Sequence, residues 1–300
     1  MKTKILLIAA LAFATITFAQ KKEVKELEKA IKTGSYGEAR TLVGAADALL
    51  GSMDVKTKEK FLLLKAQAYL GVDNKNIKDL EIAADAFSKL EGTKYAADGK
   101  TGLSNVVAAM VNSAVNDQNN NRFEEAGTKL EGAYKFSGDN KDYLFFAASN
   151  FLNAKNYTKA SELFENLLDS DYKGQRTLYY AVNAQNGEKK EFGDKQERDI
   201  LVLSKEFINP TEELSESRES TIMNYLIAIY SVEGNSEKAL ELLDKAIAAN
   251  PKDSKLLISK ANAYLKMDKM DKYKEVISQV LEMDPTNAVS YTHLTLPTKA

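Results

Sequence analysis

The sequence predicts an all-α fold, an α-solenoid of tandem helix-turn-helix repeats that one β-hairpin near residues 177–193 interrupts. Helical periodicity runs through most of the chain, and similar segments recur at a spacing of 34 residues. Only 15 glycines and 4 prolines occur in 300 residues, which leaves few turn signals for an all-β fold. The hairpin follows from an Asn-Gly pair at 186–187.

The composition argues against several kinds of site. The chain has no cysteine and one histidine, His293, so we expect no thiolate nucleophile, no disulfide bond and no zinc site built from these residues. The formal net charge of −2 argues against a nucleic-acid partner, because such proteins normally carry a basic face. We therefore expect no metal, no cofactor and no nucleic acid.

The first 19 residues have the order of a secretory signal peptide. Lys2 and Lys4 precede an apolar run that ends in small residues, which mark a cleavage site. The run, residues 5–19, is shorter than the roughly 20 residues that span a bilayer. We expect cleavage after Ala19, export to the bacterial periplasm or the exterior, and no transmembrane span in the mature chain. An uncleaved anchor is the alternative.

Repeated units occupy residues 20–174 and 214–288. Three pairs of like residues lie 34 positions apart, namely Pro251 and Pro285, Tyr230 and Tyr264, and Ala126 and Ala160. Four segments share the order of a tight turn, an aromatic or small polar residue and then an alanine, at residues 34–39, 121–126, 155–160 and 234–239. Each lies between stretches of helical periodicity, so each predicts the turn of a helical hairpin.

Residues 220–253 show why such hairpins must stack. The first helix has two adjacent apolar stripes, one of Ile222, Leu226 and Ile229 and the other of Met223, Ile227 and Tyr230. A helix with two apolar stripes needs neighbours on two sides, and a lone hairpin supplies only one. Stacking of successive hairpins covers both stripes, which is the physical basis of a solenoid.

These units resemble the tetratricopeptide repeat, whose 34-residue pattern runs W-x2-L-G-x2-Y, then A-x3-F, then P. The matching residues are Met223, Leu226, Ile227, Tyr230, Ala239, Leu243 and Pro251 in one unit, and Leu257, Lys260, Ala261, Tyr264, Tyr273, Ile277 and Pro285 in the next. The resemblance covers residues 107–174 and 220–287, and extends to 22–53 and, with a longer turn near 71–76, to 57–92. No unit has the tryptophan or the glycine beside the leucine.

Residues 175–213 break the repeat. Asn186-Gly187 between two short strand-like segments is a hairpin signal, because both turn residues favour positive φ. We expect a β-hairpin at 177–193, and a degenerate helix through the same residues is the alternative. A helix at 198–207 and a polar connector at 209–219 should follow.

The last residues, 289–300, match neither the helical period nor the repeat. A terminal repeat needs a helix with a polar outer face, and this segment does not supply one. It is typical of an adapter-derived sequence, so we expect it to be non-native and the natural protein to continue with further repeats. In that case His293 is not part of the natural protein.

In proteins similar to this one, ligand peptides lie along the concave wall made by the first helix of each repeat. The resemblance implies contacts from the residue after the tryptophan position and from the residue four places further on. In this chain these are Phe145 and Ser149, Asn224 and Ala228, and Ile258 and Asn262. Tyr179 and Tyr180 near the hairpin are further candidates, and core packing is the alternative for the aromatic residues.

These features favour a non-catalytic scaffold that binds proteins or peptides in the periplasm. One alternative is a carbohydrate-binding component of an outer-membrane uptake system, which requires Tyr179 and Tyr180 side by side on an open face. Another is an enzyme whose carboxylates converge in a deep pocket. The sequence has neither a Gly-x-Ser-x-Gly elbow nor a His-Glu-x-x-His helix, so we predict no catalytic residues.

Residues 117–121 resemble the start of a calcium-binding loop. The resemblance ends there, because Arg122 stands in place of the glycine and Thr128 in place of the bidentate glutamate. We expect a solvated turn between two helices of the repeats.

Overall fold

The computed structural model describes residues 20–72 and 76–283, and the chain forms two compact units, Met1–Asn156 and Tyr157–Ala300. The described residues are mostly helical with one small sheet, as the sequence predicts. The expected signal peptide at 1–19 and the expected non-native tail at 289–300 lie outside the described residues. Within the described ranges, no helix has the length and apolar content needed to cross a membrane.

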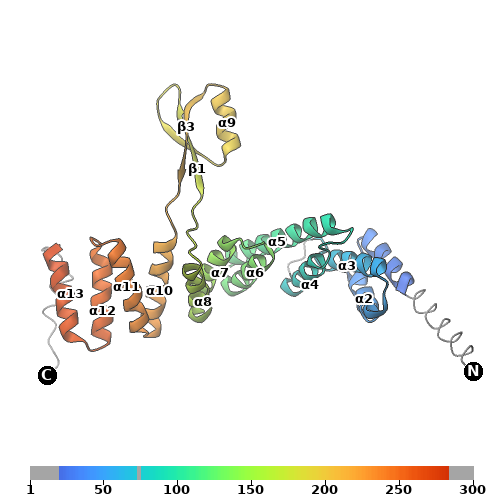
Figure 1. The fold of residues 1–300 in the computed structure, drawn as a ribbon, viewed down its shortest axis with the longest axis horizontal. Coiled ribbons are helices and arrows are strands. Elements are labelled where there is room, and N and C mark those ends of the chain that lie inside the picture. The colour runs from blue at the N-terminus through green and yellow to red at the C-terminus, as the bar shows by residue number, and fades with distance from the viewer. Residues whose placement is uncertain (1–19, 73–75, 284–300) are drawn as a thin grey trace, which may run out of the picture. The chain divides into compact units, whose positions relative to one another are not determined.

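The first unit is a succession of helices in which each packs against the next (Figure 1). It contains a helix over 20–32, α2 (Tyr36–Asp47), the short 3-10 helix η1 (Leu50–Ser52), α3 (Val55–Leu70), α4 (Ile77–Ser88), α5 (Ala96–Asn119), α6 (Phe123–Phe136) and α7 (Lys141–Asn153). In addition α3 contacts α5 and α4 contacts α6. Contacts with both the next helix and the one after it are those of stacked helical hairpins.

Side-chain caps and a left-handed glycine set the ends of these helices. At the start of α3 the Asp54 carboxylate accepts a hydrogen bond of 2.9 Å from the Thr57 N–H. At the start of α4 the Asn76 side chain accepts one of 3.0 Å from the Lys78 N–H. Gly71 follows α3 with a φ of +55°, which residues with a Cβ rarely adopt. The end of α3 and the start of α4 are therefore each fixed by a local feature of the sequence.

The apolar core of the first unit lies between neighbouring helices and forms more than one cluster. One cluster joins the helix over 20–32 to α2 and α3 and includes the fully buried Leu27 and Phe61. The next joins α3, α4, α5 and α6 and includes Leu80 and Met110. Each hairpin is thus covered by its neighbours, as the two apolar stripes of a repeat helix require.

The second unit continues the helical hairpins around an inserted sheet. Its elements are α8 (Tyr157–Asp169), β1 (Thr177–Asn183), β2 (Lys189–Phe192), α9 (Lys195–Leu203), β3 (Phe207–Leu214), α10 (Glu219–Glu233), α11 (Ser236–Ala249), α12 (Ser254–Lys266) and α13 (Met270–Met283). Although the insertion separates them in the chain, α8 and α10 are in contact, and the ring centroids of Phe164 and Tyr225 are 5.3 Å apart. The repeat packing therefore resumes across the insertion.

The inserted sheet has the strand order β2-β1-β3, and both pairs are antiparallel. The hairpin predicted at 177–193 is confirmed as β1 and β2, and the helical alternative is wrong. The turn differs from the expectation of two residues with positive φ, because only Gly187 of the Asn-Gly pair has one, at +74°. The loop is longer than two residues, and it is closed by a 2.8 Å hydrogen bond from the Asn183 N–H to the Glu188 carbonyl.

The expected connector at 209–219 is wrong in its first part, because residues 207–214 form β3. β3 is an edge strand, because it pairs with β1 on one side and with no strand of the described residues on the other. A proline such as Pro210 is tolerated there, since the missing N–H can fall on the side without a partner strand. The ladder is irregular beside Pro210, where Asn209 has a φ of +52°. Almost all of β3 is exposed, so its sequence lacks the apolar alternation that identifies a strand.

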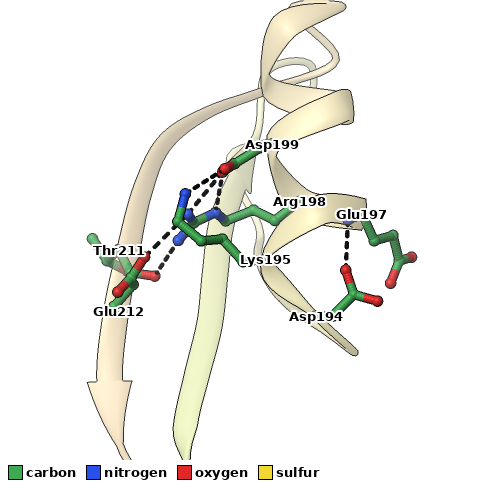
Figure 2. Close-up of polar contacts among 7 residues, drawn as sticks. All are labelled: Asp194, Lys195, Glu197, Arg198, Asp199, Thr211 and Glu212. Carbon is green, nitrogen blue, oxygen red and sulfur yellow. Dashed lines mark hydrogen bonds and ion pairs between the residues drawn. The ribbon is translucent and has the colours of Figure 1, made fainter. Parts of the chain in front are cut away.

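Helix α9 is joined to the sheet through a buried arginine, Arg198, which is 4% exposed. Figure 2 shows its guanidinium between α9 and β3, where it donates to the Thr211 carbonyl and to Glu212, each at 3.2 Å. It also donates to Asp199 at 2.7 Å, and this carboxylate raises the pKa of Arg198. The guanidinium also lies 5.3 Å from the centroid of the Tyr179 ring.

Candidate functional site

An open groove of about 580 Å³ lies on the first unit, and we call it the first-unit groove. The helix over 20–32 and α3 form its walls, and the residues just before α5 form one end. Its apolar lining is Ile31, Leu63, Leu64 and Leu70, its aromatic lining is Tyr36 and Tyr95, and its polar lining is Glu28, Lys32, Lys60 and Gln67. This combination of apolar walls with a few polar groups is typical of a binding surface.

The charged groups of the first-unit groove are paired with one another. Glu28 accepts a hydrogen bond of 2.5 Å from the Lys60 ammonium, and Lys32 is 3.1 Å from its other oxygen. Both hydrogen bonds lower the pKa of Glu28, and the one from Lys60 has the larger effect. The carboxylate therefore stays ionised at neutral pH and fixes two lysines along one wall. A group held in this way can orient a ligand and is poorly suited to proton transfer.

Gly71 and Tyr36 both line the first-unit groove and lie next to each other. A Cβ on Gly71 would make an ordinary contact of 3.7 Å with the Tyr36 ring, so the φ of +55°, and not the available space, favours glycine at this position. Tyr95 lines the same groove and packs partly against the core formed by α3 to α6. Tyr36 and Tyr95 are both half-buried, so each remains partly accessible to a ligand.

Four of the residues predicted from the sequence lie on the surface of the second unit, and we call them the second-unit row. Asn224 and Ala228 are exposed one turn apart on α10. On α12 Asn262 is exposed, and Ile258 is half-buried against the core shared with α13. The row thus offers two amides, an alanine methyl group and a half-buried isoleucine to a ligand.

Phe145 and Ser149 differ from that expectation, because their side chains are engaged within the first unit. Phe145 is 9% exposed and belongs to the core, while its neighbour Phe146 is 43% exposed. The two rings meet edge to face with centroids 5.6 Å apart. The Ser149 hydroxyl donates to the Phe145 carbonyl at 2.9 Å. Phe146, one position along, is the aromatic residue that α7 exposes.

Tyr179 and Tyr180 face opposite sides of the inserted sheet, since successive residues of a strand alternate. Tyr179 packs with Phe192 and Phe207 beneath Arg198 and α9. The Tyr180 hydroxyl donates to Glu191 at 3.2 Å on the other face. The pair therefore does not form the side-by-side platform that a carbohydrate site would require.

The groove residues on the first unit were missed in the sequence, although a signal for them was present. Glu28 stands eleven positions before Ala39, as Ser149 stands before Ala160 and Ala228 before Ala239. Counting back from the alanine would thus have added Glu28 to the candidates. The long turn after α3 shifts the count in the next repeat, so Lys60 and Leu63 gave no such signal.

Asp117 is not part of a solvated turn, and this corrects the sequence-based expectation. It lies in the last turns of α5, is 3% exposed, and forms ion pairs with Arg122 and Lys129. Its carboxylate is therefore saturated by protein donors. In the parts of the chain that the structure describes, no three histidine, cysteine, aspartate or glutamate residues gather closely enough to hold a metal ion.

A comparison with protein-family models supports the predicted tetratricopeptide repeats. Residues 233–293 match the family model described as tetratricopeptide repeat, so this part of the chain carries the repeat, and the resemblance seen in its sequence is confirmed there. Similar solved structures include YrrB, described as a TPR protein with an unusual peptide-binding site, with 9% identity, a TM-score of 0.39, and coverage of 74% of this chain and 93% of that one. Another is MamA, with 13% identity, a TM-score of 0.37, and coverage of 79% and 98%. PilF of Pseudomonas aeruginosa has 11% identity, a TM-score of 0.33, and coverage of 93% and 98%. No curated protein matches the chain.

Proposed function

We propose that the protein is a non-catalytic, exported scaffold with two separate binding surfaces for segments of partner proteins, the first-unit groove and the second-unit row. Proteins with the tetratricopeptide fold typically mediate protein–protein interactions, and their stacked hairpins present extended binding surfaces. Export rests on the signal-peptide pattern of residues 1–19 and the predicted cut after Ala19. The periplasm is the compartment that these features favour.

The observation that carries the proposal is the chemistry of the first-unit groove. Its walls are leucine and isoleucine, its ends are tyrosine, and its two lysines, Lys60 and Lys32, both pair with the one carboxylate, Glu28. Such a surface favours a partly apolar peptide segment over a highly charged ligand, because most of the lining is apolar or aromatic and each charged side chain already has an ion-pair partner within the groove. Gln67 adds an amide that a peptide backbone can use as donor or acceptor.

The alternatives receive less support. A carbohydrate site near the hairpin lacks its platform, since Tyr179 and Tyr180 face opposite sides of the sheet. An enzyme would require convergent carboxylates in a deep pocket. The first-unit groove is open and has Glu28 as its carboxylate, whose pKa the two lysines lower. We therefore favour recognition over catalysis.

A blocking substitution tests the proposal. Gln67→Trp places a large ring in the first-unit groove, and Gln118→Trp adds the same ring on the exposed surface of α5 outside it. The full-length gene is expressed in a Gram-negative host, and the exported protein is crosslinked to its neighbours and quantified by mass spectrometry. We expect partners recovered with the wild type and with Gln118→Trp to fall about tenfold with Gln67→Trp. The recovered protein should begin at Gln20.

Asn224→Trp provides the same test on the second-unit row. The proposal is wrong if Gln67→Trp and Asn224→Trp both recover every partner that the wild type recovers. A mature chain found only in the cytoplasm, with residues 1–19 retained, would contradict export. Far-UV circular dichroism of each variant checks that the helices remain folded.

A further inference from the structure

A second cleft, of about 330 Å³, lies on the second unit between α8, α10 and α11, and we call it the α8–α11 cleft. Leu168 and Leu242 are half-buried in its walls, and Leu226 is buried at its floor. Each helix contributes residues three or four positions apart, so one face of each helix forms the lining. The cleft is open to solvent at its rim, where charged side chains are found.

The α8–α11 cleft lies on the side of α10 opposite to the second-unit row. Leu226 and Tyr230 line the cleft, and they follow Asn224 by two and six residues. At 3.6 residues per turn these steps correspond to rotations of about 200° and 240° around the helix. The cleft is therefore a surface separate from the one assigned above to the partner segment.

Four of the charges on the rim are paired. Lys238 lies 2.7 Å from Glu165, and the hydroxyl of Tyr230 donates to the same carboxylate oxygen. Burial alone would raise the pKa of Glu165, but these two hydrogen bonds outweigh it and the pKa is lowered. Burial, followed by the contact with Glu165, raises the pKa of Tyr230, so its hydroxyl remains a donor. Lys245 pairs with Glu241 at 3.1 Å.

Asp169 is the fifth charged residue that lines the cleft, and it belongs to neither of these pairs. It is exposed, lines the cleft, and has no ion-pair partner among the residues that the structure describes. It is also the last residue of α8, where the terminal carbonyl groups give the helix end a partial negative charge. The carboxylate and the helix end therefore combine to attract a cation at this end of the cleft.

We propose that the α8–α11 cleft receives an arginine side chain of a partner protein. The methylene stem lies between Leu168 and Leu242, and the guanidinium meets the Asp169 carboxylate. Arginine fits better than lysine, because its planar head is weakly hydrated, packs against apolar side chains and binds a carboxylate through two hydrogen bonds. This contact goes beyond the groove binding proposed above and does not depend on it.

Binding of a small probe tests the inference. The probe is the acetylated and amidated tripeptide Gly-Arg-Gly, titrated into the 15N-labelled full-length chain, and the comparison probe has norleucine in place of arginine. We expect saturable chemical-shift changes in the amides of residues 165–169 and 238–245 with the arginine probe and none with norleucine. Asp169→Asn should weaken binding about tenfold, since one charge-assisted contact is lost.

Glu275→Gln is the matched control. Glu275 is an exposed carboxylate on α13 of the same unit and does not line the cleft, so its removal changes the net charge equally. The inference is overturned if Asp169→Asn binds the probe as the wild type does, if Glu275→Gln weakens binding as much, or if norleucine binds equally well. Gln67→Trp should leave the titration unchanged, which separates this contact from the first-unit groove.

Discussion

Two helix-interior glycines, Gly102 and Gly44, have opposite surroundings. Gly102 on α5 faces the buried ring of Phe87, and a Cβ there would lie 2.3 Å from the ring carbons. Gly44 on α2 is exposed and has nothing within 4 Å of the same position. A glycine in the interior of a helix destabilises it by about 1 kcal/mol relative to alanine. We therefore expect a glycine between two packed helices only where a Cβ would not fit. Gly102 is such a position because it lets α4 and α5 approach.

Substitution of alanine for these two glycines should change the free energy of unfolding in opposite directions. Gly102→Ala should lower the free energy of unfolding by about 1–2 kcal/mol, because steric overlap with Phe87 exceeds the gain in helix propensity. Gly44→Ala should raise it by up to about 1 kcal/mol, since only the propensity term remains. Urea unfolding followed by circular dichroism measures both. A shift of both variants in the same direction would contradict this account of α4 and α5.

At the scale of elements, a buried ion-pair cluster joins α5 to α6. Asp117, near the end of α5, binds Lys129 of α6 and accepts a 2.9 Å hydrogen bond from the Nε of Arg122 in the turn between them. Lys129 also donates to the Ser113 hydroxyl at 2.7 Å. Burial alone would raise the pKa of Asp117, but the hydrogen bonds from Lys129 and Arg122 outweigh it and the pKa is lowered.

This cluster predicts how stability depends on pH. Because the pKa of Asp117 is lower when folded than when unfolded, its contribution is complete above the unfolded value near 4 and is lost as pH falls through the folded value. Asp117→Asn leaves Lys129 without its charged partner and should cost about 3 kcal/mol at pH 7. The difference from wild type should shrink only below about pH 4.

Urea unfolding at pH 7, 5 and 3 measures the effect. Asp85→Asn is the control, because Asp85 of α4 forms an exposed pair with Lys89, the residue that follows the helix, and the substitution should cost less than about 0.5 kcal/mol. A difference between wild type and Asp117→Asn that stays constant from pH 7 to pH 3 would show that the negative charge of Asp117 is not what stabilises the junction of α5 and α6.

The elements that the sequence predicted are those with a local signal. The hairpin was found because Asn186-Gly187 marks a turn within the segment itself, and the helical units were found because alanine and aromatic residues recur. β3 was missed because its ladder with β1 joins residues far apart in the chain, and its exposed residues show no alternation. The burial of Phe145 and the exposure of Phe146 likewise depend on which neighbours pack against α7, which the repeat pattern does not specify.

At the scale of the molecule, the insertion leaves and rejoins the second unit at adjacent points. Thr177 pairs with Leu214 at the base of the sheet, and the Ser215 N–H donates to the Arg176 carbonyl at 2.9 Å. Helix α8 packs against α10 independently of the sheet, with the Phe164 ring fully buried. In a repeat array each helical hairpin is stabilised by contacts with its neighbours. We therefore infer that the inserted sheet does not stabilise the packing of α8 against α10.

The insertion should therefore be removable. Replacing residues 178–213 by Asn-Gly joins the paired Thr177 and Leu214 through a two-residue turn that suits antiparallel strands. We expect the free energy of unfolding to change by less than about 1 kcal/mol, or about 2–4 °C in melting temperature, because the contact of α8 with α10 is kept. Phe164→Ala in the intact chain should cost about 3–5 kcal/mol, since it leaves a cavity in that contact. Thermal unfolding by circular dichroism measures both variants, and a deletion that melts as early as Phe164→Ala would mean that the sheet itself holds α8 to α10.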